Sequence, residues 1–239
     1  MKWLTKTNNK LLENTGEILL GISYACIGVV TYDMFVLNNW SLLWWYPIAT
    51  FIALILGSGF YHRAIAHPTW ECPQWLKFFL TFLSTGYGFA PVITWCALHR
   101  EHHRHADTEK DPHGPRYSII DNMHILRYKP NFMYVRDLMK DKLYINQLHY
   151  YWVWFVLSAG ILISLFGFNV WAMSVAVLYF HQISINIWGH MKNFPKNHLV
   201  ALLYSPEIYH DEHHKNPNKS RLGLIDIPYF VMIRWFSQK

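Results

Sequence analysis

The stretch "ALHREHHRHADTEKDPHG", residues 97–114, contains five of the chain's 15 histidines and separates two long uncharged blocks. Only 15% of all residues are charged, so a segment this polar needs an explanation. One interpretation is a solvated loop. The other is a metal site, because imidazoles spaced three and four residues apart lie on one face of a helix and can hold an ion between its turns. A metal site would require further ligands elsewhere in the chain.

The two uncharged blocks predict membrane-spanning helices. Between Ile18 and Tyr61 the only charged residue is Asp33, and between Tyr150 and His190 there is none. Each block has about 40 residues, enough for two bilayer crossings of roughly 20 residues joined by a tight turn. We therefore predict an all-α integral membrane protein with four transmembrane helices, at about residues 17–35, 40–60, 150–168 and 170–189.

The alternative for each block is a helical hairpin buried in a soluble all-α protein. An aromatic cluster near one end of the first block disfavours it, because Trp and Tyr gather at membrane interfaces; its members are Trp40, Trp44, Trp45 and Tyr46. The turns "VLNNW" and "GFNV" carry no charge, whereas basic residues lie before, between and after the blocks. By the positive-inside rule, both termini and the middle segment are cytoplasmic.

The whole chain, residues 1–239, is thus predicted to be one multi-pass membrane domain. A cytoplasmic, histidine-rich helical cap would comprise residues 61–149 and 190–239. The net charge of +6 then reflects topology and attraction to anionic lipid or substrate headgroups. It does not indicate nucleic-acid binding.

Four short motifs bring histidines to this cytoplasmic side: "HRAIAH" (62–67), "HREHH" (99–103), "NIWGH" (186–190) and "HDEHH" (210–214). The HxxHH spacing occurs twice, which makes chance a poor explanation. His62 and His67, five apart, differ by about 140° on an ideal α-helix and would not share a face. We expect the helix to end before Pro68, so that His67 turns back toward the site. Nine convergent imidazoles predict two metal ions, and imidazole suits iron, zinc or copper.

These motifs resemble those of the membrane-bound fatty acid desaturases, in the delta-9 acyl desaturase (stearoyl-CoA desaturase-like) branch. The resemblance rests on "HRAIAH", "WCALHREHH" followed by "DTEKDPH", "NIWGH" and "HDEHH", in that order over about residues 20 to 225. It implies a centre of two iron ions (Fe2+) with no catalytic side chain beyond the metal ligands. The implied ligands are His62, His67, His99, His102, His103, His190, His210, His213 and His214, with Asn186 acting through a water. Ile187 stands where the family usually has Ser.

The resemblance further implies a long-chain acyl-CoA or acyl-lipid substrate in a bent tunnel, with Trp95 in its wall. Arg100 and Arg104, like Arg63, alternate with the ligands and are candidate contacts for the substrate headgroup or a redox partner. Asp107, Asp111, Glu207 and His181 are expected to support the ligand imidazoles, since their outer nitrogens need acceptors. The remaining histidines fit no ligand position and are expected at the surface or an interface: His105, His113, His124, His149 and His198. The apolar stretch "WLKFFLTFLSTGYGFAPVITW" (75–95) is expected to be interfacial or re-entrant.

The implied reaction inserts a cis double bond, at the delta-9 position, using dioxygen and two electrons. No cytochrome domain is recognisable in the chain, so a separate electron donor is expected, a ferredoxin or a b-type cytochrome. A lipid or carotenoid hydroxylase with the same histidine-rich centre is the alternative, because the two reactions share the first hydrogen abstraction. A membrane metal-handling protein is disfavoured, because its ligands would lie near the bilayer midplane and here they gather at one edge.

Overall fold

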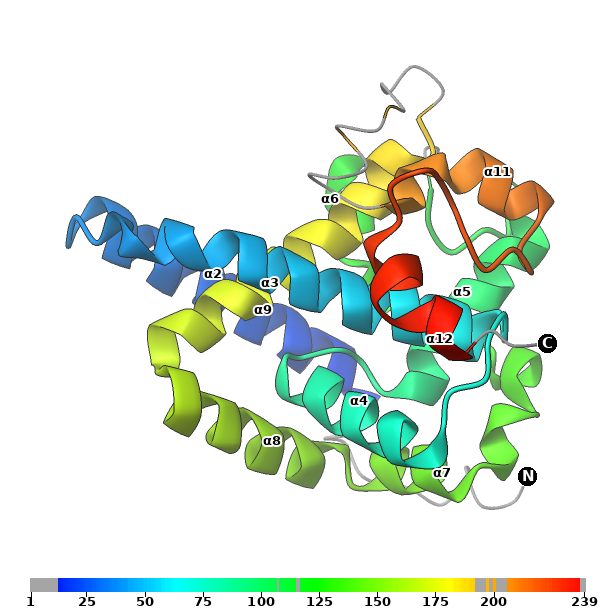
Figure 1. Cartoon of the computed structure of the whole chain (residues 1–239), viewed down its shortest axis with the longest axis horizontal. Helices are drawn as coiled ribbons and strands as arrows, with labels where there is room; N and C mark the ends of the chain where they lie inside the picture. Colours follow the sequence, from blue (N-terminus) through cyan, green and yellow to red (C-terminus); the bar gives the residue numbers. More distant parts are fainter. Residues whose placement is uncertain are drawn as a thin grey trace.

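The structure, a computed structural model, describes residues 13–106, 108–114, 117–191, 197, 200 and 206–236. Within these residues the protein is built from helices and contains no strand (Figure 1). Long apolar helices form one part of the molecule. Shorter helices and loops form a cap at one end of them, and this cap carries most of the histidines.

Three helical stretches are long and apolar enough to cross a membrane. The first is α2 (Thr15–Phe35). The second, Trp40–Ala66, joins η2 (Trp40–Trp45), α3 (Tyr46–Ala53) and η3 (Leu54–Ala66). The third, Phe168–Gly189, joins α9 (Phe168–Ser184) and η7 (Ile185–Gly189). These three stretches coincide with three of the four predicted spans.

The predicted span at 150–168 is less regular than expected. It forms α8 (Tyr151–Phe166), of 16 residues, which at about 1.5 Å per residue is shorter than the roughly 30 Å hydrocarbon core of a bilayer. It qualifies as a fourth candidate span only together with α7 (Lys142–His149), and the two helices meet at an angle of 87°. The apolar helices therefore number three, or four if this bent pair is one span.

Helix packing places the cap over the ends of the second and third apolar stretches. α9 packs against both α2 and α3, and α4 (Gln74–Gly86) packs along α8 (Figure 1). The approach of α4 to α8 depends on Gly86, because a Cβ atom there would lie only 2.8 Å from the Ser158 hydroxyl oxygen and 2.9 Å from Leu162 Cδ1. The segment expected to be interfacial or re-entrant is thus a short helix, α4, followed by a turn and by α5 (Val92–His105).

The rest of the described cap consists of short helices that connect these elements. They are α6 (Ile119–Met123), η4 (Ile125–Arg127), η5 (Phe132–Val135), η6 (Leu138–Lys140), η8 (Pro206–Tyr209), α11 (His210–Lys215), η9 (Tyr229–Ile233) and α12 (Arg234–Phe236). α5 packs against η3 and η5, and η8 packs against η7. These contacts bring the four histidine motifs into one region.

Candidate metal centre

The nine imidazoles that the sequence singles out lie in two adjoining groups. In each group, one potential ligand atom per residue lies within 4.8 Å of all the others. We call the groups the five-histidine cluster (His62, His67, His99, His103 and His213) and the four-histidine cluster (His102, His190, His210 and His214). The structure thus brings the predicted side chains together, while their binding of iron remains a prediction.

The two HxxHH motifs divide their histidines between the clusters in opposite ways. On α5, His99 and His103 are four residues apart and join the five-histidine cluster, whereas His102 joins the other. On α11, His210 and His214 are the pair four residues apart, and they join the four-histidine cluster. Residues at i and i+4 share a helix face, and the residue at i+3 is turned aside. Each motif therefore contributes to both clusters.

The expectation that His62 and His67 lie on different faces of an α-helix is wrong, because η3 is not wound as an α-helix. It is a π-helix, in which hydrogen bonds reach back five residues instead of four. The His67 backbone N–H accordingly donates to the His62 carbonyl at 2.9 Å. Residues five apart then return to nearly the same face, and the two imidazole centroids lie 5.0 Å apart. The chain leaves the helix at His67, as Pro68 predicted.

The imidazoles of each cluster point their Nε2 atoms toward one another. His67 Nε2 lies 2.9 Å from His99 Nε2, and His213 Nε2 lies 2.8 Å from His62 Nε2 and 3.1 Å from His103 Nε2. In the four-histidine cluster, His102 Nε2 and His214 Nε2 are 3.0 Å apart. Several ring nitrogens directed at one point form the arrangement that a metal ion requires.

Burial disfavours the charged form of several of these imidazoles, and the neutral form is the one that binds metal. Burial lowers the pKa of His67 and the pKa of His213 to about 2. Burial and the neighbouring imidazoles also lower the pKa values of His99, His103 and His210 well below the ordinary histidine value. Both ring nitrogens of His210 are buried and have no hydrogen-bond partner among the described residues. An imidazole donor set with an unpaired nitrogen fits iron, zinc or copper.

One buried carboxylate lies next to the Nδ1 atom of one imidazole in each cluster. Asp111 Oδ1 lies 2.7 Å from His102 Nδ1, and Glu207 Oε1 lies 2.9 Å from His62 Nδ1. A carboxylate in this place fixes the tautomer of a ligand imidazole and raises its basicity. Ser58 also donates a hydrogen bond to Glu207 Oε1. Asp111 and Glu207 therefore lie where supporting carboxylates were expected, and Asp107 lies outside the described residues.

Two of the arginines that were candidates for contacting a substrate headgroup have other partners in the structure. Arg63 is fully buried, so the expectation that it contacts a headgroup is wrong. It makes a two-pronged ion pair with buried Asp226, at 2.6 and 3.0 Å. Arg100 donates to the carbonyls of Ile65 and Ala66, at the end of η3, and to Asp137. Arg104 is exposed on α5, and its contact with a headgroup stays a prediction.

The remaining histidines divide into buried and peripheral ones. His113 is only 6% exposed, so placing it at the surface was wrong; its ring stacks on that of His102, with centroids 4.0 Å apart. His105 is half-buried, and its Nε2 lies 2.9 Å from the Tyr134 hydroxyl. His198 lies outside the described residues. Helix periodicity could not place His113, because it follows α5 in a loop.

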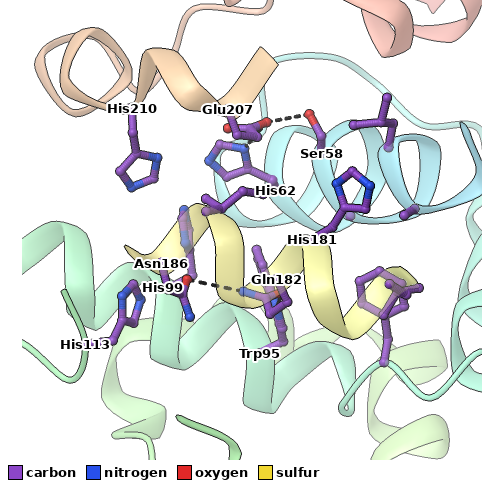
Figure 2. A pocket seen from close by; sticks show the side chains of 16 residues that line it. Ser58, His62, Trp95, His99, His113, His181, Gln182, Asn186, Glu207 and His210 are labelled. Atoms are coloured by element: carbon purple, nitrogen blue, oxygen red, sulfur yellow. Dashed lines mark hydrogen bonds and ion pairs between the residues drawn. The ribbon is translucent and has the colours of Figure 1, made fainter. Parts of the chain in front are cut away.

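A cavity of about 590 Å³, counted to its open mouth, adjoins both clusters (Figure 2). Its walls come from α3, η3, α5, α9 and η7, and from Glu207 and His210. One part is lined by apolar side chains such as Leu54, Phe89 and Leu178, and another by polar ones, among them His113 and Asn186. The mixed lining suits an organic ligand that has an apolar part and a polar end.

Of the residues predicted for the tunnel and for ligand support, the cavity lining includes Trp95, His181 and Glu207. Trp95 is in its wall, and its indole N–H donates to Gln182 Oε1 at 3.2 Å. The Gln182 amide in turn donates to Asn186 Oδ1 at 3.4 Å (Figure 2). His181 also lines the cavity, away from both clusters, with its Nε2 3.4 Å from the Thr50 hydroxyl. Sequence reasoning missed Gln182 and Asp226, since neither belongs to a ligand motif.

Comparison with known proteins gives a consistent result. No family model matches the chain. A probable chloroplastic lipid desaturase of Arabidopsis thaliana is 26% identical over 208 residues, which cover 78% of this chain and 57% of that protein. An acyl-CoA 5-desaturase of Anemone leveillei is 25% identical (81% of this chain, 68% of that protein). A delta-9 acyl-lipid desaturase of Arabidopsis thaliana is 27% identical (83% and 73%).

These relatives differ in the carrier and in the position that their names specify, but they share one class of enzyme. The matched region spans a little over half to three-quarters of their own lengths. The motif order, the clustered imidazoles, the apolar helices and these relatives agree. Together they support the assignment of the chain to the membrane fatty acid desaturase family.

Proposed function

We propose that this protein is a di-iron fatty acyl desaturase that inserts a cis double bond into a long-chain acyl group, using dioxygen and two electrons. The observation that carries the proposal is the pair of histidine clusters adjoining one partly apolar cavity. A metal-handling protein would have no need for an apolar cavity wall beside its ligands. A desaturase needs one, because an acyl chain must lie against the metal centre.

The two irons would be held by the five-histidine and the four-histidine cluster, and Asn186 would act on the second through a water. With dioxygen, the irons supply an oxidant able to remove hydrogen from an unactivated methylene pair, which no side chain can do. Glu207 and Asp111 keep His62 and His102 in the tautomer that presents Nε2 to the ion.

The cavity residues would position the acyl chain and exclude water. The apolar wall of Leu54, Phe89 and Leu178 receives methylene groups, and burying each of them stabilises binding by about 0.8 kcal/mol. Trp95 forms the wall next to the five-histidine cluster, since its ring stacks on that of His99 with centroids 5.0 Å apart. A chain in this position would present its reacting carbons to the clusters.

The finer features of the proposal follow from the sequence. The double bond would be at the delta-9 position of an acyl-CoA or an acyl-lipid. The protein would span the bilayer four times, with α7 and α8 as the irregular span, and both termini and the metal centre would be cytoplasmic. A separate ferredoxin or b-type cytochrome would deliver the electrons. Arg104, exposed beside the clusters, is a candidate contact for that partner or for the substrate headgroup.

Expression in a microbial host that makes only saturated acids, followed by analysis of fatty acid methyl esters, tests this function. We expect a new monounsaturated acid, whose double bond position is then located by mass spectrometry. His103→Ala should abolish it, whereas His105→Ala, a change on the same helix outside both clusters, should not. A hydroxy acid instead would favour the hydroxylase. An unchanged lipid profile with metal bound would favour a metal-handling protein.

A further inference from the structure

His113 brings a tenth imidazole to the edge of the metal centre. It lies in the loop after α5 and is 6% exposed. Its ring lies face to face with that of His102, with centroids 4.0 Å apart and planes inclined by 22°. With His102 and Asp111 it forms a third group whose potential ligand atoms lie within 4.8 Å of one another. No ligand motif in the sequence accounts for it.

The loop that carries His113 is fixed on both sides. The His113 backbone N–H donates to Asp111 Oδ1 at 3.2 Å, and the same oxygen lies 2.7 Å from His102 Nδ1. The next residue, Gly114, donates its N–H to Asn122 Oδ1 and accepts from Asn122 Nδ2, at 3.1 and 3.0 Å. Gly114 has a φ of +138°, which favours glycine. Hydrogen bonds from the backbone of the loop to the Asp111 and Asn122 side chains therefore hold the imidazole in place.

The His113 side chain lines the cavity and has a buried ring nitrogen that the loop contacts do not use. Its Nδ1 is buried and has no hydrogen-bond partner among the described residues, and the same holds for Asn186 Nδ2. Both side chains line the cavity, near His99 (Figure 2). An apolar ring could stack on His102 equally well, so stacking alone does not explain why the residue is a histidine. A buried nitrogen without a partner is costly, so its presence calls for a ligand.

The four-histidine cluster is the place where such a ligand would be held. An ion in this cluster would be held by four imidazoles, one fewer than an ion in the five-histidine cluster, so this is the ion that would have more room for a non-protein ligand. His113 stacks on a member of this cluster, and its ring centroid lies 6.0 Å from that of His190. A ligand entering from the cavity would therefore pass within reach of His113.

We propose that His113 is a binding residue, and that its Nδ1–H donates a hydrogen bond to a small ligand, a water or a small anion, held at the cavity side of the four-histidine cluster. The proposal rests on the proposed function, because it requires a metal ion in that cluster. It differs from a packing role in one respect. Replacing the nitrogen while keeping the ring should impair ligand binding and leave metal content unchanged.

Azide binding to the iron-loaded, oxidised full chain in detergent tests this role, followed by visible absorption and with iron counted in the same samples. His113→Phe keeps the stacked ring and removes Nδ1. We expect it to retain two irons and to bind azide roughly tenfold more weakly, the loss of about one hydrogen bond. His113→Gln, which keeps a donor, should recover most of the affinity. His105→Phe is the matched control and should bind azide like the unchanged protein.

Azide affinity in His113→Phe equal to that of the unchanged protein, with two irons bound, overturns the inference. If His113→Phe does not hold two irons, His113→Leu takes its place under the same criterion. Loss of iron in both variants makes His113 a structural support and also overturns the inference. The proposed function fails separately, when the unchanged protein binds no iron.

Discussion

The two histidine clusters are built from the same motif but differ in what lies behind them. The five-histidine cluster is connected to a buried ionic network, in which Glu207 stands beside His62 and Arg63 pairs with Asp226. The four-histidine cluster is supported by Asp111, and beside it lie nitrogens of His113 and Asn186 that have no hydrogen-bond partner within the described part of the chain. Both clusters border the cavity, but the difference indicates that one is anchored in a buried ionic network, while polar nitrogens that could contact a ligand lie beside the other.

The ionic network behind the five-histidine cluster includes residues from the C-terminal part of the described chain. The Asp226 carboxylate accepts hydrogen bonds from the backbone N–H groups of Leu222 and Tyr229 as well as from Arg63. Arg63 also donates to the Ser58 hydroxyl, which donates to Glu207. Segments more than 150 residues apart in the sequence thus meet behind one imidazole.

The largest expected effect comes from removing one ligand of either cluster. His103→Ala and His214→Ala should each abolish desaturation, because both ions are needed for the reaction. Iron content should fall from two per chain to one in both variants, since each change empties one cluster. Metal analysis of the purified proteins, beside lipid profiles of the host, checks this. Retention of two irons in either variant would contradict the assignment of that cluster.

Breaking the network behind the five-histidine cluster should mainly cost stability. Asp226→Ala removes the closer ion-pair partner of the fully buried Arg63 and leaves, among the described residues, only Glu207, at 4.0 Å, which should destabilise the protein by about 3–5 kcal/mol. Asp137→Ala is the matched control, because it breaks the Arg100 pair whose carboxylate side chain is 61% exposed; that change should cost about 0–1 kcal/mol. Thermal unfolding in detergent measures both. Equal losses would mean that the buried pair has no special role.

Changing the carboxylates tests whether each one serves its own cluster. Glu207→Gln and Asp111→Asn should each weaken iron binding by about 10- to 100-fold, the usual cost of losing a group that orients a ligand imidazole. Glu207→Gln should affect the ion of the five-histidine cluster, and Asp111→Asn that of the other. Competition with a chelator, monitored by Mössbauer spectroscopy, distinguishes the two ions. Loss of the same ion in both variants would remove the distinction between the clusters.

A further test is the pH dependence of the metal-free protein. Burial lowers the pKa of His67 and the pKa of His213 from 6.5 to about 2 in the folded state. Below pH 6.5 the unfolded chain therefore binds protons that the folded chain does not, and the free energy of unfolding falls. The metal-free protein should be most stable above about pH 6.5 and lose stability steadily toward acid. Denaturant titrations at several pH values check this, with His67→Gln expected to show a shallower slope.

The ligand motifs could be predicted from the sequence, because helix periodicity relates spacing to position. His99, His102 and His103 had to lie near one another on α5, and the repeated spacing at His210 predicted a second such helix. The division of each motif between two clusters could not be predicted. It depends on how α5 and α11 face each other, which local periodicity does not determine.

Other features depend on backbone geometry or on contacts that are distant in sequence. The π-winding of η3, which brings His62 and His67 onto one face, has no signature in residue type. The bend of 87° between α7 and α8 occurs at Tyr150, where the predicted span begins, so the apolar composition predicted α8 but not the helix that turns away before it. The ion pair between Arg63 and Asp226 could not be predicted either. The two residues are 163 positions apart, and nothing in the sequence distinguishes buried charges from surface charges.

The central claim is that the protein holds two iron ions, one in each cluster. Anomalous diffraction at the iron edge, from crystals of the iron-loaded protein, tests it most directly. Two peaks are predicted, one enclosed by His62, His67, His99, His103 and His213, and the other by His102, His190, His210 and His214. A single peak, or a peak outside both groups, would contradict the claim.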